Sequence, residues 1–211
     1  MQRLRIRRAL LSVTHKDGLA ELGRCLSQGG VELISTGGTL RALSAAGLPA
    51  TPVSSVTGFP EVLDGRVKTL HPRIHAGLLA DKDNPDHMAA LSEHDIKPLD
   101  MIVVNLYDFA KAAAQGLELA QAIEQIDIGG PTLLRAAAKN CHSVLVVPET
   151  SFYGAVMDEL KAENMSVGLE LRLQAAQRTF ELVSAYDDMI ARYFKQKLSG
   201  GMPPILQDLL K

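Results

Sequence analysis

The chain has 211 residues, of which 46% are hydrophobic and 22% charged, and this composition is typical of a globular protein with a substantial core. Its formal net charge of −2, its 4% of aromatic residues and its lack of tryptophan argue against a nucleic-acid surface. The apolar run at 9–11 is too short for a signal peptide or a membrane span. We therefore expect a cytoplasmic protein with two reduced thiols, Cys25 and Cys141, which lack a metal-binding spacing.

Strands and helices are expected to alternate along the chain. Short apolar runs predict strands over 9–13, 31–34, 49–53, 101–105 and 143–147. A helix capped by Asp17 is expected over 17–28, and a short helix is expected to follow the segment 35–39 and end at about 46. Further helices are expected over 117–125, over 131–139 with Pro131 at its start, and over most of 150–197. This alternation predicts an α/β fold with a mainly parallel sheet, which binds ligands at the carboxyl ends of its strands.

The segment 54–72 has little periodicity and several Gly and Pro residues, and such a long irregular segment is usually functional or disordered. Its apolar residues argue against disorder. The segment ends with Gly65-Arg-Val-Lys-Thr-Leu-His-Pro72, in which Pro72 is expected to begin a helix and His71 to be extended. Arg66, Lys68 and His71 are either an ordinary charged loop or part of an anion site, where Lys68 would stabilise negative charge.

Two loops at neighbouring strand ends favour phosphate binding. Ser35-Thr-Gly-Gly-Thr39 lies between a strand and a helix, where small residues, hydroxyls and helix amides suit a phosphate. Ser12-Val-Thr-His-Lys16 ends the preceding strand and adds hydroxyls and an ammonium group. A plain tight turn and a solvated lysine remain the alternatives.

Asn105-Leu-Tyr107 and Ile126-Asp-Ile-Gly-Gly-Pro131 also follow strands or begin helices. Asp127 is a helix cap, a general base or a residue that orients an amide. Taken one at a time, each of these residues is better explained by a structural role. Their common placement at strand ends is what makes the group a candidate site. His71 and His75 have helical i,i+4 spacing, but no third ligand is evident, so a metal site is not expected.

Together these segments resemble the IMP cyclohydrolase domain of the bifunctional formyltransferase/IMP cyclohydrolase of purine biosynthesis. The resemblance covers about residues 8–197. Its segments are Leu11–Val13, Lys16, Ser35–Thr39, Thr57–Glu61, Asp64–Pro72, Asn105–Tyr107, Ile126–Pro131, Arg135–Asn140 and Ala185–Asp187.

The resemblance implies a methylglyoxal-synthase-like fold, with a mainly parallel sheet flanked by helices and a helical C-terminal region. It implies one domain at 1–197 and a linker or tail at 198–211. The implied reaction closes the ring of 5-formamido-1-(5-phospho-ribosyl)imidazole-4-carboxamide to IMP with loss of water, without metal or organic cofactor. It also implies a homodimer, and a separate formyltransferase as the source of substrate if the chain is complete. Composition and the short apolar run argue against a nucleic-acid or membrane partner.

Site residues carry over from the family by position. Those expected to bind the phosphate are Ser12, Thr14, Lys16, Ser35, Thr36, Gly37 and Thr39. Those expected at the base are Arg66, Thr69, Asn105 and Gly129. The catalytic residues implied are Lys68, Tyr107, Asp127 and Lys139. We expect Asp127 to orient the carboxamide or accept its proton, the two lysines to stabilise an oxyanion, and Tyr107 to relay a proton.

The chain departs from the family at two positions near these residues. His15 stands where most relatives have Asp, and Asp108 replaces a Pro after Tyr107. Two rival functions stay open. A methylglyoxal-synthase-type lyase would release phosphate from dihydroxyacetone phosphate, and a regulatory module would bind a nucleotide without turnover.

Overall fold

The computed structural model describes residues 3–114 and 117–199. The chain forms two compact units. The larger comprises Met1–Leu106 and Asp127–Phe180, and the smaller comprises Tyr107–Ile126 and Glu181–Lys211. Most of the linker or tail expected at 198–211 lies outside the described residues.

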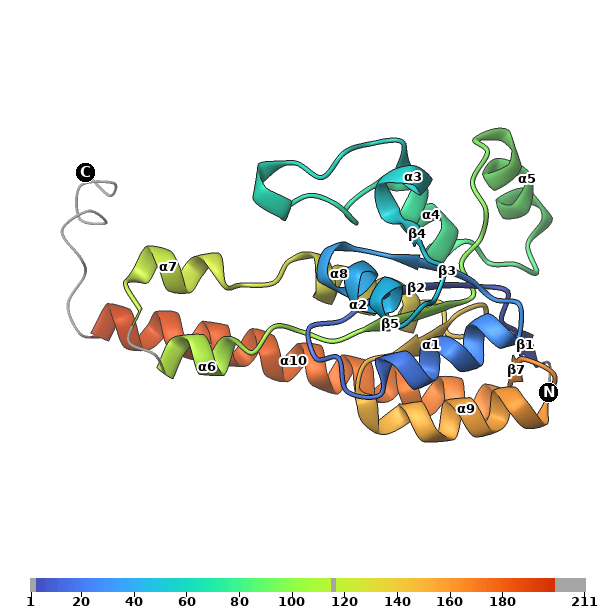
Figure 1. Cartoon of the computed structure of the whole chain (residues 1–211). Helices are drawn as coiled ribbons and strands as arrows, with labels where there is room; N and C mark the ends of the chain where they lie inside the picture. Colours follow the sequence, from blue (N-terminus) through green and yellow to red (C-terminus); the bar gives the residue numbers. More distant parts are fainter. Residues whose placement is uncertain (1–2, 115–116, 200–211) are drawn as a thin grey trace. The chain divides into compact units, whose positions relative to one another are not determined.

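A five-stranded sheet forms the centre of the larger unit (Figure 1). Its strands are β2 (Arg8–Ser12), β3 (Glu32–Ser35), β4 (Thr51–Pro52), β5 (Met101–Val104) and β6 (Leu145–Val147). Their order is β4-β3-β2-β5-β6, and every pair is parallel. All residues of β5 and β6 are buried, as expected for strands covered on both faces. The predicted mainly parallel sheet is confirmed.

The direction of the strand order changes between β2 and β5. From β2 the chain moves outward through β3 to β4, and it then returns to the other side of β2. Such a reversal opens a ligand crevice outside the carboxyl ends of the two strands. Ser12 ends β2 and is followed by Val13–Lys16, and Asn105 follows β5, so both segments lie at this position.

Helices cover both faces of the sheet, with α1 and α9 on one side and α3 and α4 on the other (Figure 1). The helices of the larger unit are α1 (Leu19–Gln28), α2 (Gly37–Ala45), α3 (Val53–Thr57), η1 (Leu63–Gly65), α4 (Pro72–Leu79), α5 (Pro85–Glu93), α8 (Gly129–Lys139), η2 (Thr150–Phe152) and α9 (Tyr153–Ala162). Helix α10 (Leu169–Ser199) contributes residues to both units.

Some local expectations are confirmed and others are wrong. Pro72 begins α4, and His71 before it is extended. Asp17 does not cap α1, because Gly18 takes the N-cap position in a left-handed conformation. Helix α8 begins two residues before Pro131. The pairing of β1 (Leu4–Arg5) with β7 (Ser166–Val167), and helices α3 and α5, were not predicted.

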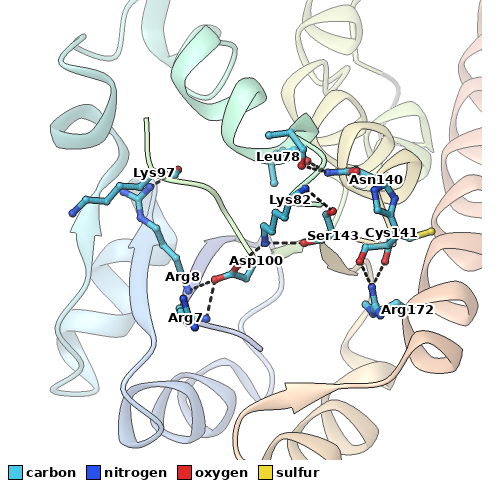
Figure 2. Close-up of polar contacts among 12 residues, drawn as sticks. Arg7, Arg8, Leu78, Lys82, Lys97, Asp100, Asn140, Cys141, Ser143 and Arg172 are labelled. Carbon is cyan, nitrogen blue, oxygen red and sulfur yellow. Dashed lines mark hydrogen bonds and ion pairs between the residues drawn. The ribbon is translucent and has the colours of Figure 1, made fainter. Parts of the chain in front are cut away.

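A buried polar network joins the amino ends of three strands (Figure 2). Asp100 Oδ2 accepts hydrogen bonds from Arg7 N at 2.8 Å and Arg8 N at 2.9 Å, while Oδ1 pairs with Lys82 Nζ. Lys82 Nζ also donates to Ser143 O at 2.7 Å. Burial lowers the pKa of Lys82, and the Asp100 charge opposes this shift. The network lies at the amino ends of β2, β5 and β6, and therefore away from the candidate site.

The smaller unit consists of α6 (Phe109–Ala114), α7 (Leu119–Glu124) and the C-terminal part of α10. Phe109 is fully buried, and its ring packs edge-on against Tyr186 and Tyr193. Among the described helices of the whole chain, none combines the length and apolar character that crossing a membrane requires.

Candidate active site

The loops after β2 and β3 are joined through their hydroxyl groups. Ser12 Oγ and Thr36 Oγ1 lie 2.8 Å apart. Thr39 Oγ1 accepts from Val13 N and donates to Val13 O, both at 2.9 Å. Ser35 is fully buried and donates to Leu11 O at 2.8 Å. Ser35 and Thr39 therefore hold the two loops together, whereas the Ser12–Thr36 pair keeps one hydroxyl hydrogen for another acceptor.

Lys16 is directed into its own loop. Its Nζ donates to Val13 O, lies 3.3 Å from Thr39 Oγ1 and lies 3.4 Å from Thr14 O. Burial lowers the pKa of Lys16, and the charge of Arg41 lowers it further. The ammonium group thus brings positive charge to this end of the sheet, but its donors are already engaged.

Asn105 connects the end of β5 to the loop after β2. Its Oδ1 accepts from Thr14 N at 2.5 Å and from His15 N at 3.3 Å. This contact crosses the position where the strand order reverses. Asn105 therefore lies with the expected phosphate residues, although the family resemblance assigned it to the base.

Gly37 and Gly38 form the first turn of α2, and Gly37 has a positive φ of 39°. Thr36 before them is extended. The first amides of a helix point away from it without internal partners, which suits an anion. The structure therefore brings Ser12, Thr14, Lys16, Ser35, Thr36, Gly37 and Thr39 together at one edge of the sheet.

The loop that carries Lys68 is a strained turn. Leu63, Asp64 and Gly65 have φ values of 54°, 53° and 90°. The turn is closed by a bridge between Val62 and Val67. Two consecutive non-glycine residues in the left-handed region are costly, and such strain is common at ligand-binding loops. Arg66 is exposed and Lys68 is half-buried.

Thr69 joins this loop to the start of α8. Thr69 is 3% exposed, and its Oγ1 lies 3.3 Å from the position that a Cβ atom on Gly129 would occupy. Asp127 Oδ1 accepts from Gly130 N at 2.9 Å, so its carboxylate contacts the first turn of the helix. The structure thus places Thr69, Asp127 and Gly129 together. The capping interpretation and the catalytic interpretation of Asp127 are both compatible with this geometry.

Helices α4 and α8 pack against each other and are also tied at their C-terminal ends. Asn140 Nδ2 donates to Leu78 O at 2.7 Å (Figure 2). It also donates to Ala80 O at 2.9 Å. Because Thr69 meets Gly129 at the other end, both helices direct their N-termini toward the candidate site. The partial positive charge of two helix N-termini favours an anionic ligand there.

Lys139 lies at the opposite end of α8 from Gly129. Ten residues of helix separate their backbones by about 15 Å, and the Lys139 side chain is exposed. The backbone of Lys139 is therefore not placed with Asp127 and Gly129. Tyr107 belongs to the smaller unit, where its side chain is 49% exposed and its carbonyl oxygen accepts from Phe109 N at 2.9 Å.

Asp108, the second departure from the family, has a local role. Its Oδ1 accepts from Lys111 N at 3.0 Å, which is the contact of a helix N-cap at the start of α6. His15, the other departure, is exposed. Asp108 thus replaces the rigidity of a proline with a capping hydrogen bond.

The two histidines at helical spacing have separate environments. His71 Nδ1 accepts from Arg73 N at 3.1 Å and caps α4. The Nε2 atom of His75 is buried, and burial lowers the pKa of this residue. Within 3–114 and 117–199, no group of three His, Cys, Asp or Glu side chains is arranged to hold a metal ion.

One residue that the sequence analysis did not single out lies beside the phosphate loops. The NH2 atom of Arg41 lies 3.7 Å from the position of a Cβ atom on Gly38. A cation three residues after a glycine in the first helical turn was the signal that could have revealed it.

Comparison with known proteins assigns the chain to a family. The MGS-like domain matches residues 18–132, and the AICARFT/IMPCHase bienzyme family matches residues 137–209. The bifunctional purine biosynthesis protein PurH of Rhodospirillum rubrum is 48% identical over 200 residues, which are 95% of this chain and 38% of that protein. The chain thus spans well under half the length of this relative.

A solved structure supports the same assignment. The crystal structure of ForH has a TM-score of 0.78 and 30% sequence identity, and the match covers 90% of this chain and 99% of that one. The methylglyoxal-synthase-like fold is confirmed by this match and by the parallel sheet. The chain therefore belongs to the MGS-like domain family, and it corresponds to the IMP cyclohydrolase part of the AICARFT/IMPCHase bienzymes.

Proposed function

We propose that this chain is an IMP cyclohydrolase, which closes the purine ring of a formamido-imidazole-carboxamide ribotide with loss of water. The observation that carries the proposal is the 48% identity with PurH across 95% of the chain. The joined loops at the carboxyl ends of β2, β3 and β5 support it, because a ribotide needs a phosphate subsite. We also propose that the protein is cytoplasmic.

The reaction is an intramolecular condensation. The carboxamide nitrogen attacks the formyl carbon, a C–N bond forms, and the formyl oxygen develops negative charge. That oxygen is protonated and leaves as water, while the carboxamide nitrogen and the formamido nitrogen each lose one proton. Because the reactants share one ring, the enzyme gains most by holding the two exocyclic groups in a reactive orientation.

Asp127 is proposed to orient the carboxamide or accept its proton. The hydrogen bond from Gly130 N fixes the direction of its carboxylate at the start of α8. Gly129 lies nearby, and a Cβ atom at this position would come within 3.3 Å of Thr69 Oγ1, so the glycine leaves room for the Thr69 hydroxyl. A carboxylate held in this way is preorganised for an amide N–H donor.

Lys68 is proposed to stabilise the developing oxyanion. It lies one residue before Thr69 and is half-buried, where an ammonium interacts more strongly with a new charge than in water. One such donor contributes roughly 3–4 kcal/mol of transition-state stabilisation. Lys139 is proposed as a second donor on the family resemblance alone, and Tyr107 as a proton relay. Retention of Lys68, Tyr107, Asp127 and Lys139 argues against a purely regulatory module.

We further propose a homodimer that uses α10. Leu173 and Phe180 are exposed apolar residues seven positions apart in the larger unit, and Phe194 and Leu198 are exposed in the smaller unit. Apolar residues at helical spacing suit a helix-packing interface. The substrate carries a formyl group, so a formyltransferase on this or another chain must supply it. Light scattering on the purified protein tests the dimer, and a monomeric mass would refute it.

The reaction itself is tested by incubating the purified chain with the formamido ribotide and following the hypoxanthine absorbance. Formation of IMP supports the proposal. Tight binding of IMP without turnover would instead indicate a regulatory module. Release of phosphate from dihydroxyacetone phosphate would indicate the lyase.

A further inference from the structure

The phosphate loops contain two cations with different availability. Lys16 Nζ is engaged by Val13 O, Thr14 O and Thr39 Oγ1. Arg41, by contrast, is exposed and has no hydrogen bond or ion pair with any described residue. The Lys16 ammonium therefore has protein acceptors beside it, whereas none of the five N–H donors of Arg41 is engaged by a described residue.

The Arg41 side chain extends toward the N-terminus of α2. Side chains of an α-helix lean toward its N-terminus and cover the preceding turn. Accordingly, Arg41 NH2 lies 3.7 Å from the Cβ position of Gly38, in the first turn of the helix. The absence of a side chain at Gly38 leaves the guanidinium and the first helical amides open to the same ligand.

Neither Lys16 nor Arg41 forms an ion pair with a described acidic residue. The field of Arg41 reaches Lys16, since it contributes to the lowered pKa of that ammonium. Two neighbouring cations without a counterion repel each other, and a bound dianion removes this repulsion.

We propose that Arg41 is a direct ligand of the substrate phosphate and the residue that makes the site select a phosphorylated nucleoside over the free nucleoside. Lys16 adds a second positive charge beside Arg41. The inference rests on the proposed function for its substrate. It goes further by adding a residue that the family resemblance did not supply.

The test compares the binding of IMP and inosine by titration calorimetry. Arg41→Met is expected to weaken IMP binding on the order of tenfold to hundredfold, the range for a hydrogen bond to a charged group. Inosine binding should be unchanged. Arg41→Lys should lie between the two, because an ammonium lacks the planar fork of donors. Arg24→Met, which removes an exposed arginine from α1, is the matched control and should bind both compounds as the wild type does.

The outcomes separate this inference from the reaction. If Arg41→Met closes the ring with an unchanged KM and binds IMP like the wild type, the reaction stands and the role of Arg41 is refuted. If the wild type shows no turnover but loses its preference for IMP in Arg41→Met, the role stands and the reaction is refuted. A wild-type protein that does not prefer IMP to inosine overturns the role of Arg41, and ring closure is then judged by turnover alone.

Discussion

At the scale of single residues, most of the proposed chemistry depends on polar groups already fixed by a backbone contact. Asp127 is held by Gly130 N, and Asn105 is held by the amides of Thr14 and His15. Such contacts preorganise a side chain, because the entropy lost in ordering it is part of the folding free energy and is not lost again on substrate binding. Lys68 differs, because its position depends on a strained loop rather than on a hydrogen bond from a neighbouring strand.

Gly65→Ala tests whether that loop controls activity. The φ of 90° is unfavourable for alanine by about 1 kcal/mol, and the new Cβ atom would lie 2.4 Å from Glu61 Oε1 and 3.9 Å from Lys68 Nζ. We expect kcat/KM to fall, with only a small change in melting temperature, because the loop is largely exposed. Gly154→Ala is the control, since its Cβ meets nothing within 4 Å, and it should leave kcat/KM unaltered. Equal kcat/KM for Gly65→Ala and wild type would show that the turn does not position Lys68.

At the scale of secondary-structure elements, two kinds of expectation fared differently. The parallel strands, the helix after Thr39 and the start of α4 at Pro72 were predicted, because apolar runs, Gly and Pro act locally. The contact of Thr69 with Gly129, and that of Asn105 with Thr14, join residues far apart in the chain. Sequence periodicity carries no information on such pairs, so the grouping of the site residues into these two clusters was not predictable.

Helix α10 is joined to the end of β6 by an ion pair that predicts a pH dependence. Arg178 contacts Glu149 through two hydrogen bonds of 2.7 and 2.8 Å, and these lower the pKa of the Glu149 carboxyl. Because the folded-state pKa is below the ordinary value of 4.5, the stabilisation is present above that pH. It is lost as pH falls through the folded-state pKa.

The comparison of wild type with Arg178→Met in urea unfolding tests this sign. Since both side chains are partly exposed, the variant should be less stable at neutral pH by about 1 kcal/mol or less. The difference should shrink at acidic pH, as Glu149 becomes protonated in the wild type. A difference that grows on acidification would contradict the assignment.

At the scale of the whole molecule, the candidate binding site lies at the carboxyl ends of the strands, and a buried network that stabilises the fold lies at their amino ends. The carboxyl ends of the strands carry the hydroxyls, amides and cations of the candidate site. The amino ends carry the Asp100–Lys82 network, whose members are largely buried and paired. Substitutions at the two edges should therefore affect different measurements.

Asp100→Ala is expected to destabilise the fold by about 3–5 kcal/mol, because it leaves the Lys82 ammonium and two backbone amides without their acceptor in a buried site. Lys82→Met in the Asp100→Ala background should recover part of that loss, since it removes the unpaired charge. Urea unfolding of the two single variants and the double variant measures the coupling. Strict additivity would show that the two side chains do not interact energetically.

The measurement that tests the central claim most directly is the rate of ring closure by the wild type, Lys68→Met and Lys161→Met. Lys161 is an exposed lysine on α9 and serves as the matched control. The account predicts IMP formation by the wild type and by Lys161→Met, and a kcat lowered on the order of a hundredfold to a thousandfold in a folded Lys68→Met protein. Wild-type turnover by Lys68→Met would remove Lys68 from the mechanism, and absence of IMP formation by the wild type would contradict the proposed function.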